Sequence, residues 1–221
     1  MLQRLTLFDL DHTLLSGDSD VLWCDFLIEQ GELDGASFKA RNADIDARYQ
    51  NGSITVEEFS NFYLSTLAGR SPEQWHGLRK RYFASEILPR LPQTAMDLVR
   101  GHLDSGDLVV LTSATNRFLT ELTAAVLGIE HLLGTEPEFQ DGVFTGRASG
   151  VLNMRGGKVT RLHAWLAGRG EKLEQFHSSA YSDSMNDLPL LEAVNEPIAV
   201  DPDPKLAAIA KARGWRVLSL R

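Results

Sequence analysis

The chain has 221 residues, a formal net charge of -8, 43% hydrophobic residues and 24% charged residues. This composition is typical of a folded globular protein, and the length allows one core with a smaller inserted lobe. The negative charge repels nucleic-acid phosphates and anionic lipid head groups, and no run of five or more Lys or Arg residues occurs. We therefore expect neither nucleic acid nor a membrane surface among its partners.

The sequence contains no segment close to the roughly 20 apolar residues that span a membrane. Asp9 and Asp11 interrupt the first apolar stretch before it reaches the length of a signal peptide. Cys24 is the single cysteine, so an internal disulfide is excluded. These features predict a cytoplasmic protein, and they leave monomer and homodimer both open.

Short apolar runs alternate with helical segments along most of the chain. The expected strands are residues 5–8, 108–111, 179–182, 197–200 and 216–219. Such alternation is typical of a parallel sheet covered by helices, so the sequence predicts an α/β fold with a Rossmann-like, doubly wound parallel sheet. Residues 138–152 in addition predict a hairpin, because Phe139 and Val143 flank the turn pair Asp141-Gly142.

Residues 16–88 depart from this alternation, because helix-start signals dominate and no strand-like run appears. Thr55 with Glu58 matches a capping box, and Ser71 with Gln74 matches another. Glycine and proline mark the two ends of the region, at 16–18 and 88–92. The sequence therefore predicts a small helical cap at 16–88, inserted into a core formed by 1–15 and 89–221.

Two aspartates directly follow the first expected strand, within the run Asp9-Leu10-Asp11-His12-Thr13-Leu14. In an open α/β sheet, ligands bind at the carboxyl ends of the strands. The same Asp-x-Asp spacing occurs at positions 18/20, 44/46 and 201/203. We interpret the pair at 44/46 as part of a solvated helix face. We interpret the pair at 201/203 as a turn with a helix cap.

Later strand ends supply the other groups that phosphoryl transfer needs. Ser113 offers a hydroxyl and an amide to a phosphoryl oxygen, and Lys158 offers a compact cation. The run from Asp183 to Asp187 offers further acids for a hard cation. A carboxylate nucleophile approaches a phosphomonoester dianion only if charge is neutralised, so the set is chemically coherent.

This order of motifs resembles the haloacid dehalogenase superfamily, and the helical insertion after the first motif resembles its phosphoserine-phosphatase-like branch. The resemblance implies that Asp9 is the nucleophile, that Asp11 is the general acid and then the base, and that Lys158 completes the catalytic set. It implies Mg²⁺ held by the Asp9 carboxylate, the Asp11 backbone carbonyl and Asp183. It also implies that Ser113 and Ala114 contact the substrate. Thr13 and Asp187 would lie around the metal ligands, where Asp187 would orient either a metal-bound water or Lys158.

The substrate is expected to be a small phosphomonoester. Phosphoserine phosphatases hold the substrate amine with an acid soon after the first motif, where this chain has Asp18 and Asp20 and, nearby, Trp23. They hold the substrate carboxylate with a cap arginine, for which Arg41 and Arg48 are candidates. Histidinol phosphate carries an amine without a carboxylate and suits an acidic, aromatic cap equally well, so both substrates stay open.

Two other classes of protein compete with this interpretation. A signalling module of the receiver type also phosphorylates a strand-end aspartate, but it needs no helical cap, so residues 18–88 argue against it. A binding protein of low activity on the same fold is disfavoured, because no expected catalytic position carries an inert residue.

Overall fold

The computed structural model describes residues 3–50 and 53–221, which form one seven-stranded sheet with flanking helices. The strand order is β4-β3-β2-β1-β5-β6-β7. The strands are β1 (Gln3–Phe8), β2 (Leu108–Asn116), β3 (His131–Gln140), β4 (Val143–Ser149), β5 (Phe176–Ser182), β6 (Glu196–Val200) and β7 (Arg216–Leu218). All five strands expected from the sequence are present, and the predicted mostly parallel α/β fold is confirmed.

The central strand β1 pairs in parallel with both β2 and β5, and β6 and β7 continue the parallel sheet. The predicted hairpin is also present, since β3 and β4 pair antiparallel around Asp141 and Gly142, whose φ angles are 51° and 85°. The sequence did not reveal that β3 begins as a parallel partner of β2. The run from His131 to Gly134 is too short and too polar at its ends to indicate a buried strand.

Alternating strand residues pack on the two faces of the sheet. On one face, Phe8 and Leu111 belong to an apolar cluster with helices α5 (Gln93–Asp104) and α6 (Arg117–Val126). On the other face, Leu7 and Val110 pack with residues of α7 (Gly156–Gly168), α8 (Leu188–Ala193) and α9 (Pro204–Arg213). The helix cap predicted at 203 is confirmed, because the Asp203 side chain accepts from backbone amides at the start of α9.

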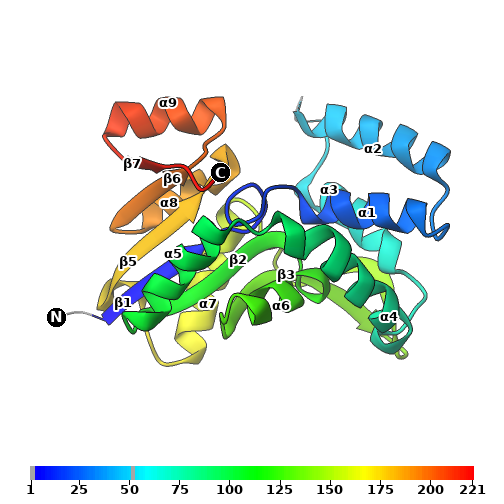
Figure 1. Ribbon diagram of the computed structural model, residues 1–221, viewed down its shortest axis with the longest axis horizontal. Helices are drawn as coiled ribbons and strands as arrows, with labels where there is room; N and C mark the ends of the chain where they lie inside the picture. Colours follow the sequence, from blue (N-terminus) through cyan, green and yellow to red (C-terminus); the bar gives the residue numbers. More distant parts are fainter. Residues whose placement is uncertain (1–2, 51–52) are drawn as a thin grey trace.

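Helices form the segment between β1 and α5. The first three, α1 (Ser19–Glu29), α2 (Gly35–Gln50) and α3 (Val56–Leu64), lie together at the end of the molecule away from the N-terminus (Figure 1). They are followed by α4 (Pro72–Tyr82), a π-helical turn at Phe83–Ile87 and a 3₁₀ turn at Leu88–Arg90. Both predicted capping boxes are present, at Thr55/Glu58 and Ser71/Gln74. Within the described part of the chain, no helix combines the length and apolar character needed to cross a bilayer.

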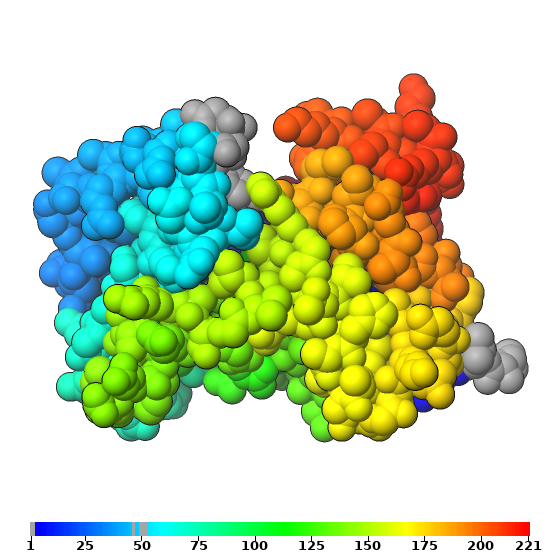
Figure 2. Space-filling view, turned by 180° about the vertical axis from the view of Figure 1, so that it is seen from behind, coloured from blue at the N-terminus to red at the C-terminus, as the bar shows by residue number. Residues whose placement is uncertain are grey.

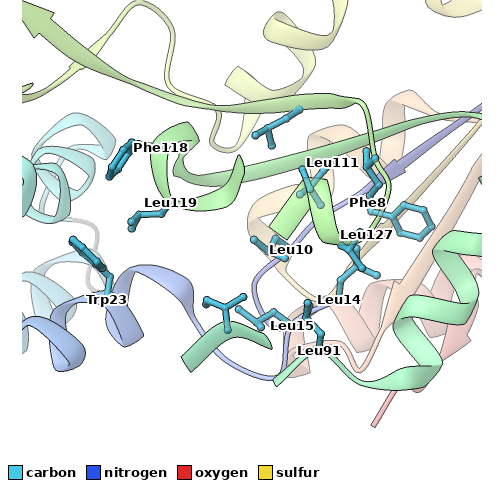
Figure 3. Close-up of a cluster of buried hydrophobic side chains, with 14 of the residues drawn as sticks. Phe8, Leu10, Leu14, Leu15, Trp23, Leu91, Leu111, Phe118, Leu119 and Leu127 are labelled. Carbon is cyan, nitrogen blue, oxygen red and sulfur yellow. The ribbon is translucent and has the colours of Figure 1, made fainter. Parts of the chain in front are cut away.

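The helical segment shares one apolar cluster with the sheet. The cluster extends from Leu111 of β2 past Leu10 and Leu15 to Trp23 of α1 (Figure 3). The indole of Trp23 lies edge-on to Trp75 and to Tyr82, so α1 and α4 meet through aromatic rings. Because the residues after Asp9 belong to this cluster, the first motif and α1 are packed as one unit.

The hairpin also holds the helical segment by backbone hydrogen bonds. The Gly69 amide donates to the Phe144 carbonyl at 2.9 Å, and the Phe144 amide donates to the Arg70 carbonyl at 3.0 Å. The Asn61 side chain accepts from the Ala148 amide at 2.9 Å.

The surface is hollowed between the helical segment and the C-terminal part of the chain (Figure 2). The division into a core and a cap at residues 16 and 88 stays a prediction.

Gly146 of β4 lies directly against the turn that precedes α4, and we expect Gly146→Ala to loosen this contact. A Cβ atom there would meet Ser65 Cα at 3.1 Å and Ala68 Cβ at 3.0 Å. The loss should be about 2–4 kcal/mol of unfolding free energy, from positive-φ strain plus overpacking. Urea denaturation measures it.

Gly142→Ala is the matched control. Gly142 has nearly the same φ, 85° against 84°, but nothing lies within 4 Å of its Cβ position. Its loss of unfolding free energy should stay near the cost of the positive-φ strain alone, about 1–2 kcal/mol. Equal destabilisation of both variants would show that the contact with Ser65 and Ala68 contributes nothing.

Candidate active site

Polar side chains gather at the carboxyl ends of three neighbouring strands. Asp9 directly follows β1, Thr115 is the penultimate residue of β2, and Asp183 directly follows β5. Lys158 comes from the first turn of α7. Together they line a cavity of about 230 Å³. The topology accounts for this, since parallel strands end at the same edge of the sheet.

Lys158 is buried between two carboxylates. Its Nζ atom lies 2.6 Å from Asp9 Oδ1 and 2.6 Å from Asp187 Oδ2, and the residue is only 2% exposed. The Ser182 hydroxyl donates to the same Asp187 oxygen at 2.8 Å. Burial lowers the pKa of Lys158, but Asp187 and Asp9 outweigh burial and leave the pKa above its ordinary value. Lys158 is therefore a fixed positive charge beside Asp9.

Asp9 has more negative than positive neighbours. Burial raises its pKa well above the ordinary value, against the lowering effect of Lys158. The nearby carboxylates of Asp187, Asp183 and Asp11 raise it further. One ammonium group thus does not balance the charge around Asp9.

The Thr13 hydroxyl joins Asp9 to Asp183. It lies 3.1 Å from Asp9 Oδ2 and 2.9 Å from Asp183 Oδ1, and it accepts from the Asp183 amide at 3.0 Å. A hydroxyl has one proton, so it satisfies only one of these two oxygens. Burial raises the pKa of Asp183 to about 6. Two carboxylates that share one donor fit a hard divalent cation bound between them.

The donor set has the composition that Mg²⁺ prefers. No three His, Cys, Asp or Glu side chains among residues 3–50 and 53–221 converge as a metal cluster. Two carboxylates, from Asp9 and Asp183, completed by a backbone carbonyl and waters, would suit Mg²⁺, because Mg²⁺ usually keeps several waters. The residues present therefore fit the predicted ion.

Asp11 is held by partners from two parts of the fold. Its Oδ1 atom accepts from the Ser19 backbone amide at 2.8 Å, and its Oδ2 atom accepts from the Thr115 hydroxyl at 2.9 Å. The Ser113 hydroxyl lies 3.4 Å from the same Oδ2. The Asp11 carboxylate therefore lies between the end of β2 and the start of α1, on the wall of the cavity.

The helical segment supplies the opposite wall with acids and aromatic rings. Asp18 and Asp20 line the cavity beside Phe59 and Tyr63 of α3. Asp18 also caps α1, accepting from the Val21 amide at 3.0 Å, and burial, with Asp11, raises its pKa to about 6. Burial, followed by Asp18 and Asp11, also raises the pKa of Asp20. This wall is suited to a group that carries positive charge.

Comparisons with known proteins agree with this geometry. A profile of the haloacid dehalogenase-like hydrolase family matches residues 6–192. The chain belongs to this family. It is 39% identical to a histidinol-phosphatase of Neisseria meningitidis over 222 residues, with all of both chains covered. It is 31% identical to a phosphoserine phosphatase of Mycobacterium tuberculosis over 217 residues, which cover 97% of this chain and 70% of that one.

Solved structures agree with the fold. A crystal structure of a Bordetella pertussis protein of unknown function matches with a TM-score of 0.96 and 48% identity, covering all of both chains. A substrate-bound phosphoserine phosphatase matches with a TM-score of 0.69 and 19% identity, covering 100% of this chain and 94% of that one. The predicted place of this haloacid dehalogenase-like protein in the phosphoserine-phosphatase-like branch is confirmed.

Most of the predicted site residues of this haloacid dehalogenase-like protein line the cavity. They are Asp9, Asp11, Asp18, Asp20, Ala114, Lys158, Asp183 and Asp187. Thr13 is buried between Asp9 and Asp183, as described above. Ser113 is fully buried and does not line the cavity, because its hydroxyl accepts from the Thr115 amide at 3.1 Å. Its contact with phosphate stays a prediction.

The structure does not bring Trp23 and the two arginines to the cavity. Trp23 is 1% exposed, and its indole N–H donates to the Thr66 hydroxyl at 3.1 Å, so it is a core residue rather than a substrate contact. The Arg41 guanidinium lies over the Phe62 ring, and Arg48 lies 3.4 Å from Glu58. Both arginines therefore have partners within the helical segment itself, an aromatic ring for Arg41 and a carboxylate for Arg48.

Several lining residues escaped the sequence analysis, among them Phe59, Tyr63 and Thr115. Phe59 and Tyr63 also pack in the apolar cluster that includes Trp23. The four-residue spacing of Phe59 and Tyr63 places both on one face of α3, but that spacing serves a core as well as a pocket. Thr115 lies four residues beyond the predicted end of its strand, in a stretch where the pairing of β2 with β3 shifts register. No local signal marks such a position.

The first turn of α7, which carries Lys158, packs against the loop before it, and we expect Gly157→Ala to disrupt this packing. A Cβ atom at Gly157 would lie 2.0 Å from the Leu152 carbonyl oxygen, so the backbone beside Lys158 has to move. We expect a loss of roughly 2–3 kcal/mol of unfolding free energy, and a loss of activity greater than this instability explains. Urea denaturation and turnover of an aryl phosphate measure the two effects.

Gly156→Ala is the control, because nothing lies within 4 Å of its Cβ position. Alanine is also a better helix former at that position, so stability should stay within about 0.5 kcal/mol or rise. Equal activity of both variants would contradict the role given to Gly157.

Proposed function

We propose that this protein is a Mg²⁺-dependent phosphatase that transfers the phosphoryl group of a small phosphomonoester to Asp9 and then hydrolyses the aspartyl-phosphate. The enzyme class rests on the family match and on its named relatives, and the predicted phosphatase is confirmed at that level. The chemistry rests on one observation. Asp9, Lys158 and Asp183 meet at a single edge of the sheet.

Each catalytic residue has a defined role in this proposal. An Asp9 oxygen attacks phosphorus, and the bond to the leaving alcohol oxygen breaks as Asp11 gives that oxygen a proton. Water then attacks phosphorus and passes a proton to the Asp11 carboxylate, which releases phosphate and restores Asp9. Lys158 stays charged throughout and stabilises the negative charge on the phosphoryl oxygens.

The metal is assigned to Asp9, Asp183 and the backbone carbonyl of Asp11. Bound there, Mg²⁺ supplies positive charge against the phosphoryl oxygens. The support for this assignment is the charge around Asp9 and the single Thr13 proton shared by two carboxylates. Asp187 holds Lys158 from the side opposite Asp9.

The charges on the cavity wall favour a substrate that carries an amine. Asp18 and Asp20 face the cavity from the helical side, and Phe59 and Tyr63 add rings that suit a planar or cationic group. Neither Arg41 nor Arg48 lines the cavity to receive a carboxylate. This favours histidinol phosphate over phosphoserine, and the full-length match to a histidinol-phosphatase points the same way.

The two rival classes have less support. A receiver-type module needs no substrate cavity, whereas residues of α1 and α3 complete one here. A binding protein of low activity has no need of a lysine buried between two carboxylates. We assign residues 16–88 to a substrate-binding cap, which recognises the part of the substrate beyond its phosphate.

Asp9→Asn should abolish phosphatase activity. An amide cannot replace the carboxylate nucleophile, so p-nitrophenyl phosphate turnover with Mg²⁺ should fall by at least about 10³-fold. EDTA should abolish wild-type turnover, and added Mg²⁺ should restore it. Asp97→Asn is the control, because Asp97 is an exposed residue of α5, and its activity should stay within about twofold. Turnover by Asp9→Asn near the wild-type rate would refute the nucleophile.

Asp18→Asn should weaken binding of amine-bearing substrates selectively. Asparagine keeps the α1 cap, since it is as good an N-cap residue as aspartate, but it removes the charge. We expect KM for histidinol phosphate to rise about tenfold, about 1.4 kcal/mol, with a much smaller change for p-nitrophenyl phosphate. A steady-state comparison of histidinol phosphate, phosphoserine and p-nitrophenyl phosphate measures this. Equal KM changes for all three would rule out an amine contact at Asp18.

A further inference from the structure

Thr115 is a buried hydroxyl between two carboxylates of the cavity. It is 2% exposed, and its Oγ1 atom lies 2.9 Å from Asp11 Oδ2 and 3.2 Å from Asp20 Oδ2. The Ser19 hydroxyl donates to the same Oγ1 at 3.1 Å. The single proton of Thr115 is thus directed toward the carboxylates, with Asp11 the nearer acceptor.

The two Asp11 oxygens have different partners, which fixes the plane of the carboxylate. Thr115 binds Oδ2, and the Ser19 amide binds Oδ1 at 2.8 Å. Hydrogen bonds to a charged acceptor are shorter and stronger than neutral ones, and the other hydroxyl near Oδ2, that of Ser113, lies farther away, at 3.4 Å. Loss of the Thr115 proton would therefore free one end of the Asp11 carboxylate to rotate.

We propose that Thr115 is a positioning residue for proton transfer by Asp11, acting together with the Ser19 amide. The inference rests on the proposed function, in which Asp11 gives its proton to the leaving oxygen as the bond between phosphorus and that oxygen breaks. Thr115 touches neither the phosphoryl group nor the leaving group in this scheme. It holds the acid at the angle from which the proton is delivered.

The helical segment takes part through Ser19. This residue is the first of α1, and its carbonyl accepts from the Tyr82 hydroxyl at the end of α4 at 2.7 Å. The amide that holds Asp11 is therefore fixed by the packing of α1 against α4. Thr115 belongs to the sheet, so the acid is oriented jointly by the sheet and the helical segment.

A series of leaving groups tests the proposal. p-Nitrophenolate leaves without a proton, whereas an alkyl alcohol needs one, so loss of an oriented acid slows alkyl phosphates selectively. With the Mg²⁺-loaded enzyme, we expect Thr115→Val to lower kcat for histidinol phosphate by about 10- to 100-fold and kcat for p-nitrophenyl phosphate by less than about threefold. Thr115→Ser restores the hydroxyl and should recover kcat for histidinol phosphate to within about threefold.

Two further variants make the result decisive. Thr120→Val removes another buried hydroxyl, which bonds only to the backbone carbonyls of Asn116 and Arg117 in the described structure, and should show no dependence on the leaving group. Asp11→Asn should show the same selectivity as Thr115→Val, but more strongly. Equal loss on both substrates, or no loss, in Thr115→Val would overturn the role of Thr115 alone. Absence of selectivity in Asp11→Asn would instead show that Asp11 is not the general acid, and the inference about Thr115 would fail with that assignment.

Discussion

The buried contact between Lys158 and Asp9 is the interaction on which the rest of the site depends. Removing a lysine from water costs several kcal/mol unless its charge is well paired, and Asp9 and Asp187 provide that pairing at 2.6 Å on either side. Such a pair is a poor source of stability compared with apolar packing. Its retention in the core is explained better by chemistry, because it fixes a positive charge beside a carboxylate that would otherwise repel a phosphate.

The same contact leaves a surplus of negative charge at the end of the sheet. Asp187 and Asp9 share the ammonium of Lys158, whereas Asp183 shares with Asp9 a single Thr13 proton. A divalent cation between Asp9 and Asp183 would settle this imbalance. The acids Asp18 and Asp20 lie on the helical wall, so in the proposed function a substrate cation and the metal would neutralise different parts of one cavity.

Much of this arrangement follows from local sequence signals. A strand end carries its polar residue to the rim of a parallel sheet, so the meeting of Asp9 and Asp183 was predictable. The Asp141-Gly142 turn and the two capping boxes were predictable for a similar reason, since each depends on a few adjacent residues. Lys158 was predicted as the cation of the set, but its place in the first turn of α7 was not, because no local signal indicates that its side chain reaches Asp9.

Other features depend on packing between distant segments. Trp23 and Tyr63 are both buried aromatic residues, of helices α1 and α3, yet of the two Tyr63 alone also lines the cavity. The difference arises from the angle at which α1 and α3 meet the sheet, which helical periodicity does not contain. The local sequence does not indicate the parallel part of β3 or the position of Thr115 either, since both depend on the pairing of β2 with β3.

The helical segment is joined to the sheet at two separate places, and this links substrate recognition to proton transfer. At one place, the hairpin binds the turn before α4 through Phe144. At the other, the Ser19 amide binds Asp11. Asp18 and Asp20 flank Ser19 in the sequence, so the residues proposed to face the substrate cation and the amide proposed to orient the acid belong to one turn of chain. A shift of that turn would change substrate contact and acid geometry together, so the two proposed functions of the helical segment would have a common structural basis.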